Sequence, residues 1–246
     1  MTHSADRRSS HPPRALVETS LGLIPLLLVS GINLIQLELP VISLVRALVL
    51  YGALAALLLR HLPSPLVEHG LGPANRLTLL RATFVVSLAA VVPYAASLSD
   101  TGLWWVVALA GVSLALDGVD GWLARRSATA TPFGARFDME LDAFLMLVLA
   151  CLVWRSGRLD WWVLLLGVPR YAFVAAGWRC PWLSAPLPER LRRKTGCVIQ
   201  GIALLVCLIP IVSTGGATAV AVVTLGLLRV SCGIDVLWLA RHQSKD

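Results

Sequence analysis

This chain of 246 residues is 57% hydrophobic and only 14% charged. Soluble domains carry roughly 25% charged residues, so the composition excludes an ordinary soluble protein. The net charge of +7 does not indicate a nucleic-acid partner, because the basic residues flank hydrophobic segments. We therefore predict an all-α, polytopic helix bundle embedded in the lipid bilayer.

The predicted elements begin with a polar, basic, proline-containing segment over residues 1–15, which is typical of a disordered tail. Crossing a bilayer takes about 20 apolar residues, and turn-forming residues separate the apolar segments of that length. The segment 61–77 is too short and too rich in proline to cross, and we expect it to lie along the lipid headgroups. We therefore predict about eight transmembrane helices, at approximately 16–36, 41–60, 78–98, 102–123, 139–156, 160–178, 197–213 and 217–239.

The distribution of basic residues predicts the orientation of these helices. With a cytoplasmic N-terminus, most of the 21 lysines and arginines fall in cytoplasmic loops or at cytoplasmic helix ends. This agrees with the excess of positive charge that cytoplasmic loops carry. We expect a multi-pass protein of a bacterial cell (inner) membrane, with both termini in the cytoplasm.

Four aspartates form two helix-spaced pairs near the cytoplasmic ends of neighbouring predicted helices. Asp117 and Asp120 are three residues apart, Asp138 and Asp142 are four apart, and Glu140 points to the other side of its helix. Helix capping uses one carboxylate per helix start, so it does not explain all four. Carboxylates at a bilayer edge need neutralisation, and their hard oxygens suit Mg²⁺, Mn²⁺ or Ca²⁺. The spacing predicts a divalent-cation site that could clamp a phosphoryl group.

The same segment reads DxxDGxxAR, eight residues, then GxxxDxxxD, and this pattern resembles the signature of the CDP-alcohol phosphatidyltransferases. The resemblance implies a metal-dependent transferase of phospholipid biosynthesis. Such an enzyme moves a phosphatidyl group from a CDP-linked lipid, such as CDP-diacylglycerol, to the hydroxyl of a small alcohol and releases CMP. The fixed positions of the pattern are all present, as Asp117, Asp120, Gly121, Ala124, Arg125, Gly134, Asp138 and Asp142.

The resemblance also implies roles for individual residues. The four aspartates would hold two Mg²⁺ or Mn²⁺ ions, and Asp142 would also act as the base on the acceptor hydroxyl. The residues implied for nucleotide binding are Gly121, Ala124, Arg125, Gly134, Asn75, Thr78 and Arg81. For Asn75, Thr78 and Arg81, which come before the motif, an alternative explanation remains: a helix N-cap and an arginine that only sets the membrane topology.

Two basic residues further along the chain are predicted to bind a phosphate on the acceptor alcohol. Arg170 falls in the middle of a predicted apolar helix, where an unpaired charge indicates a polar cavity. Lys194 lies in RRKTG, which is similar to the pattern of members that use glycerol 3-phosphate. The alternative for Lys194 is a topological anchor at a cytoplasmic helix start.

The family core has six membrane helices, which would correspond to the predicted spans from 78 to 239. We therefore expect two extra transmembrane helices at 16–60 and a family-like membrane domain at 61–246, and the resemblance implies a homodimer. A divalent-cation transporter is one alternative, although the outer halves of the relevant helices lack the polar residues of an ion path. An inactive scaffold relative is another, and the intact motif disfavours it.

Overall fold

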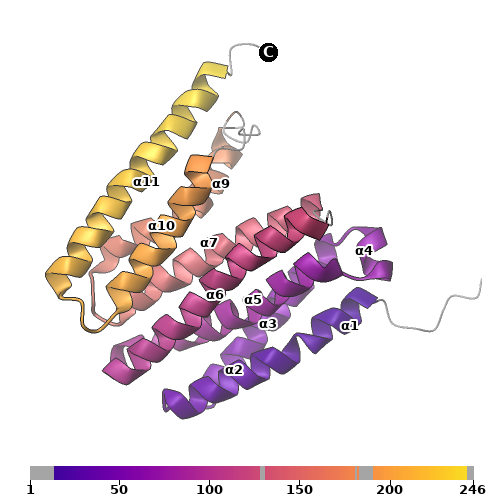
Figure 1. Ribbon diagram of the computed structural model, residues 1–246, viewed down its shortest axis with the longest axis horizontal. Helices are drawn as coiled ribbons and strands as arrows, with labels where there is room; N and C mark the ends of the chain where they lie inside the picture. Colours follow the sequence, from indigo (N-terminus) through magenta and orange to yellow (C-terminus); the bar gives the residue numbers. More distant parts are fainter. Residues whose placement is uncertain (1–13, 128–130, 181, 183–190, 243–246) are drawn as a thin grey trace, which may run out of the picture.

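The computed structural model describes residues 14–127, 131–180, 182 and 191–242 (Figure 1). All regular structure in these residues is helical, which confirms the predicted all-α fold. The elements are α1 (Arg14–Leu21), α2 (Leu23–Gln36), α3 (Ile42–His61), α4 (Ser64–His69), α5 (Gly72–Val91), the 3-10 helix η1 (Val92–Ser97), α6 (Asp100–Ser127), α7 (Pro132–Arg155), the 3-10 helix η2 (Trp161–Val163), α8 (Leu164–Gly167), α9 (Pro169–Arg179), α10 (Leu191–Leu208) and α11 (Thr214–His242).

Multiple helices are long and apolar enough to cross a membrane, so the chain is a multi-pass membrane protein. Within the described residues there are five such segments, rather than the eight predicted. The remaining helices are shorter or more polar: α9 has 11 residues, and α7 carries charged residues in its first half. The five segments are Arg14–Gln36, Ile42–His61, Gly72–Ser97, Asp100–Gly118 and Thr214–Arg241.

Several helix boundaries differ from the prediction. The helix α5 begins at Gly72 rather than at residue 78, and α7 begins at Pro132 rather than at 139. Hydropathy marks where the chain becomes apolar, whereas each helix starts earlier, where a proline lies in its first turn. At α7, Pro132 occupies the first turn and the Thr131 side chain accepts a hydrogen bond from the Gly134 amide at 3.0 Å.

The predicted span 160–178 is not one continuous helix. It consists of η2, α8 and α9, and the helix breaks immediately before Pro169. Proline has no amide hydrogen and its ring clashes with the preceding turn, so a helix ordinarily breaks there. The segment 61–77, predicted to lie along the headgroups, contains the short helix α4 and the first turns of α5.

The main apolar core lies between α5, α6 and α7 on one side and α8, α10 and α11 on the other. Fully buried leucines such as Leu149 of α7 and Leu204 of α10 fill it. A second apolar core joins α1, α2 and α3 to the opposite face of α5, through residues that include Leu26, Tyr51 and Val86. The helix α5 therefore belongs to both cores.

Polar contacts also tie the N-terminal helices to the rest of the bundle. The Trp105 indole of α6 donates to the Asn33 side-chain oxygen of α2 at 2.8 Å. The hydroxyls of Ser30 and Ser87 are 2.9 Å apart and link α2 to α5. Lipid is as apolar as a leucine side chain, so hydrogen bonds of this kind contribute to holding membrane helices together.

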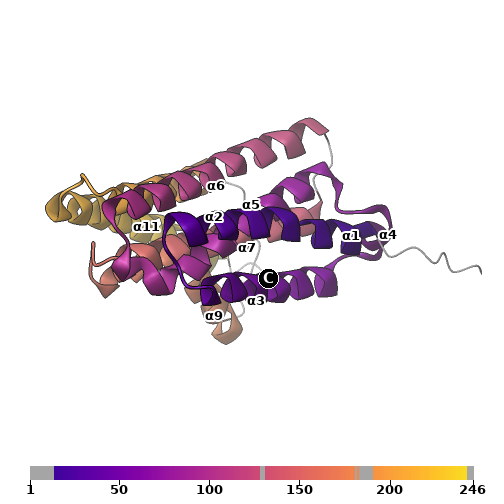
Figure 2. The same ribbon diagram turned by 90° about the horizontal axis from the view of Figure 1, so that it is seen from below.

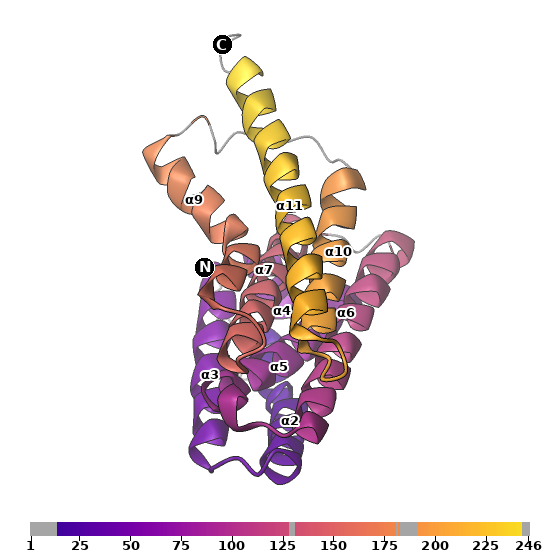
Figure 3. The same cartoon turned by 90° about the vertical axis from the view of Figure 1, so that its left-hand side faces the viewer.

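One end of the bundle gathers the helix ends that carry the predicted site residues. The starts of α1 and α5 lie there, beside α4 and the end of α6 (Figure 2). The start of α10 and the ends of α9 and α11 also point towards this end (Figure 3). The turn between α2 and α3 lies at the opposite end.

Candidate functional site

Three of the four predicted aspartates come together from two helices. Asp117 projects from α6, and Asp138 and Asp142 project from successive turns of α7. Each contributes a carboxylate oxygen, and these oxygens lie within 4.8 Å of one another. Their side chains are 29%, 35% and 30% exposed. We refer to these three residues as the carboxylate cluster.

Arg81 of α5 lies against this cluster and pairs with every member of it. Its Nη1 is 2.8 Å from Asp117 Oδ1 and 2.7 Å from Asp138 Oδ1, and its Nη2 pairs with Asp142. The Arg81 side chain is completely buried. A buried guanidinium is stable only when it is paired and hydrogen-bonded, so the cluster and Arg81 stabilise one another.

The starts of α5 and α7 approach each other closely beside the cluster. A β-carbon at Gly134 would overlap the Asn75 side-chain oxygen, so the absence of a side chain at this position permits the contact. Asn75 is itself fixed, because its Nδ2 donates to the Leu71 carbonyl at 2.7 Å. Thr78, one turn further along α5, is buried and donates to the Ala74 carbonyl at 3.1 Å.

The capping and anchoring alternatives are wrong for the described residues. The N-cap of α5 is Leu71, so Asn75 lies inside the helix, and a topological arginine would be exposed rather than buried like Arg81. Thr131 caps α7, and Asp138 therefore lies in the interior of that helix. Glu140 lies outside the cluster, as predicted.

The described side chains of the site are mainly acidic. Three carboxylates lie against one guanidinium. The donor atoms are all hard oxygens, which fit a hard divalent cation better than a soft one. The residues present therefore suit a divalent metal.

Comparison with protein-family models gives one decisive match. The model described as CDP-alcohol phosphatidyltransferase matches residues 71–230, which is 160 of the 246 residues. The chain belongs to the CDP-alcohol phosphatidyltransferase family. Searches of curated proteins and of solved structures gave no match. The family match starts at the N-cap of α5, so the helices α1 to α4 lie before it.

The structure does not describe the side chains of several predicted site residues. The backbone of α6 continues through the second half of the motif to Ser127, and the backbone of α10 begins at Leu191. The side chains from 119 to 127 and from 191 to 194 lie outside the described residues. The predicted roles of these residues stay predictions, and they concern Asp120, Gly121, Ala124, Arg125 and Lys194.

The structure places Arg170 differently from the prediction. Arg170 lies in the first turn of α9, after the break at Pro169, and not in the middle of an apolar helix. Its Nη2 pairs with Glu140 Oε1 of α7, and both side chains are partly exposed. The pair joins α9 to the face of α7 that points away from the carboxylate cluster. The predicted role of Arg170 towards an acceptor phosphate stays a prediction.

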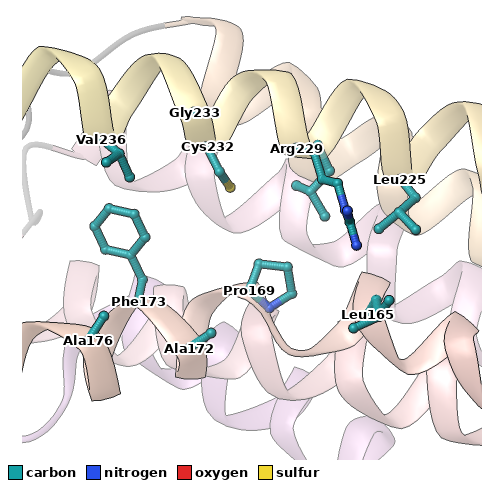
Figure 4. Close-up of a pocket in the computed structure, with 11 residues that line it drawn as sticks. Leu165, Pro169, Ala172, Phe173, Ala176, Leu225, Arg229, Cys232, Gly233 and Val236 are labelled. Atoms are coloured by element: carbon teal, nitrogen blue, oxygen red, sulfur yellow. The ribbon is translucent and has the colours of Figure 1, made fainter.

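A groove of about 340 Å³ separates α8 and α9 from α11 (Figure 4). Apart from Arg229, its lining is apolar, and Phe173 of α9 faces Val236 of α11. The Arg229 side chain extends from α11 towards Leu165 and Pro169. No member of the carboxylate cluster lines it. The groove is therefore a separate feature from the candidate site of this family member.

Proposed function

We propose that this chain transfers a phosphatidyl group from a CDP-linked lipid, such as CDP-diacylglycerol, to the hydroxyl of a small alcohol and releases CMP. The observation that carries the proposal is the carboxylate cluster, which brings three hard oxygen ligands together from two helices inside the part of the chain that matches the family. Displacement at a negatively charged diphosphate needs positive charge at the reacting oxygens. A site that can bind cations meets this need.

The proposed reaction is a displacement at the phosphorus that carries the diacylglycerol. The acceptor oxygen forms a bond to this phosphorus, the bond to the CMP oxygen breaks, and CMP leaves. The proton of the acceptor hydroxyl goes to a carboxylate oxygen, for which Asp142 is the proposed base. Bound Mg²⁺ or Mn²⁺, held by the carboxylate cluster together with Asp120, would neutralise the charge that develops on the phosphoryl and leaving oxygens.

The chain's own contacts explain how Asp142 would be held for this role. Arg81 pairs with Asp142 and with both other carboxylates, so one rigid group sets the relative positions of all three. Groups that are already in place before the reaction need no reorganisation during it. We propose that Arg81 orients the base, and that Asn75 and Thr78 on the same helix contact the nucleotide.

The place of the site at one end of the bundle suits both proposed substrates. A lipid donor reaches it by diffusion in the bilayer, and a small alcohol reaches it from water. We propose that this end faces the cytoplasm, because the basic residues of the chain concentrate there by the predicted topology.

Release of CMP by the purified protein tests the proposal directly. The protein in nanodiscs, with CDP-diacylglycerol and Mg²⁺ or Mn²⁺, is offered a panel of phosphorylated and unphosphorylated alcohols. Asp142→Asn is expected to abolish CMP release, and Glu140→Gln, a matched change on the same helix outside the cluster, is expected to retain it. Wild-type protein that releases no CMP with any alcohol would contradict the proposal, and an active Asp142→Asn variant would contradict the assignment of the base. Uptake of divalent cations into vesicles would instead support the transporter alternative.

A further inference from the structure

The helix α1 lies before the part of the chain that matches the family, yet one of its side chains contacts the start of α5. The Leu71 amide donates to Glu18 Oε2 at 2.8 Å. Arg76 Nη2 lies 2.5 Å from Glu18 Oε1. The Glu18 side chain is only 13% exposed. Glu18 therefore joins α1 to α5 through a largely buried carboxylate.

The surrounding residues are shaped to admit this carboxylate. Gly70 has a φ of +95°, and a β-carbon there would lie 2.5 Å from Glu18 Oε1. Tyr51 of α3 also contacts α1, because its hydroxyl donates to the Thr19 carbonyl at 2.7 Å. Gly22 leaves the space that the Tyr51 hydroxyl occupies. The contact at Glu18 is thus one of two polar contacts that hold α1 against its neighbours.

The start of α5 needs such a partner. A helix start leaves several amide groups without partners inside the helix, and the N-cap residue Leu71 has no polar side chain to supply one. Glu18 accepts from the N-cap amide, as the glutamate of a capping box does, except that here the glutamate comes from another helix. Its negative charge also lies at the positive end of the α5 dipole.

This cap is connected to the candidate site by a short series of contacts. The amide of Leu71 is bound to Glu18, and the carbonyl of the same residue is bound to the side chain of Asn75. The Asn75 side-chain oxygen in turn packs against Gly134 at the start of α7. The two helices joined in this way are those that carry Arg81, Asp138 and Asp142.

We propose that Glu18 is a positioning residue for the nucleotide-binding side of the site. By capping α5 from α1, it fixes the first turn of α5 and through it the Asn75 side chain. The N-terminal helices thereby form part of the framework of the site without contributing a reacting group. This inference rests on the proposed function, in which Asn75 contacts the nucleotide of the donor.

Three variants distinguish the capping role of Glu18 from that of a simple ion pair between α1 and α5. Arg76→Gln removes the ion pair, which involves a side chain that is 59% exposed, and leaves the cap intact. Glu18→Ala removes both carboxylate oxygens, and with them the cap as well as the ion pair. The exchanged variant, Glu18→Arg with Arg76→Glu, restores the ion pair but places a side chain without any acceptor beside the Leu71 amide.

Two measurements on the full-length protein in nanodiscs test the proposal. The first is the KM for CDP-diacylglycerol and the kcat at saturating alcohol. Glu18→Ala is expected to raise this KM about tenfold, the size of effect that loss of one charge-assisted hydrogen bond gives, with kcat nearly unchanged. Arg76→Gln is expected to keep the wild-type KM, and the exchanged variant is expected to keep the raised KM of Glu18→Ala.

The second measurement is hydrogen–deuterium exchange over residues 70–78. Glu18→Ala and the exchanged variant are expected to lose protection at this segment, and Arg76→Gln is expected to keep it. A wild-type KM in Glu18→Ala, or restoration of KM and protection by the exchanged variant, would overturn the proposal. If the wild-type protein released no CMP, the proposed function would fail, whereas the exchange measurement would still decide whether Glu18 caps α5.

Discussion

Replacing Arg81 with methionine is expected to make the stability of the protein depend on divalent cations. The change removes the guanidinium that pairs with Asp117, Asp138 and Asp142 and leaves three carboxylates whose oxygens lie within 4.8 Å of one another. Two like charges at about 4.8 Å repel by about 3.5 kcal/mol at an effective dielectric constant of about 20. Removing one partner of a buried ion pair costs about 3–5 kcal/mol.

The partial exposure of the carboxylates places the expected loss near the lower value, about 3 kcal/mol of unfolding free energy. For a chain of this size that corresponds to a decrease in Tm of roughly 6–12 °C. Thermal unfolding followed by tryptophan fluorescence, in detergent with EDTA, measures the decrease. A cation at about 100 times its Kd adds about 2.7 kcal/mol, so saturating Mg²⁺ or Mn²⁺ is expected to recover most of the lost stability.

The control is Arg158→Met, because Arg158 is also partly buried but donates only to backbone carbonyls, those of Cys207, Ile209 and Val212. Its loss of stability is expected to be the same with EDTA and with Mg²⁺. An Arg81→Met variant whose Tm is the same in EDTA as in saturating Mg²⁺ or Mn²⁺ would refute the reasoning, because the carboxylate cluster would then not be a cation site. Wild-type stability of this variant in EDTA would refute it as well.

Three further changes have defined outcomes. Gly134→Ala places a methyl group against the Asn75 side chain and is expected to lower unfolding free energy by about 1–3 kcal/mol and to reduce CMP release. Leu149→Ala opens a cavity in the main core and is expected to cost about 2–5 kcal/mol in thermal unfolding without a specific change in substrate KM. Arg170→Gln is expected to raise the KM for a phosphorylated alcohol, and Glu140→Gln, which frees Arg170, is expected not to raise it.

The first and the last of these predictions have outcomes that would contradict them. Gly111→Ala, at a glycine of α6 whose β-carbon would meet nothing within 4 Å, is the matched control for the first and is expected to be neutral. A neutral Gly134→Ala would show that α5 and α7 tolerate a wider spacing. Equal increases in KM from Arg170→Gln and Glu140→Gln would mean that their ion pair matters only for structure.

The acidic residues of the site could be predicted from the sequence because helix periodicity alone places Asp138 and Asp142 on one face. The all-helical, membrane-embedded fold could also be predicted, because hydropathy, like helix periodicity, depends on residues that are neighbours along the chain. The partners of Arg81 were missed, although a buried arginine in an apolar helix must find acids, and these acids were the ones already identified. That requirement could have been used to predict the pairing of Arg81 with these aspartates.

Other features depend on contacts that no local pattern encodes. The close approach of the Asn75 side chain to Gly134 can be predicted only by knowing which faces of α5 and α7 meet. The contact of Glu18 with Leu71 starts from a segment that the family model does not include. The early starts of α5 and α7 were missed because hydropathy reports the boundary of lipid rather than the boundary of the helix. These are properties of the packed bundle.

The sharing of α5 between two apolar cores has a consequence for shortened forms of the protein. A form cut after His61 would keep the whole carboxylate cluster, and the surface of α5 uncovered by the cut would be apolar enough to face hydrocarbon. Ser87 and Trp105 would nevertheless lose their hydrogen-bond partners inside the bilayer, where no water can replace them. Such a form would insert and yet be strained, so the first three helices are difficult to delete even though they supply none of the reacting groups.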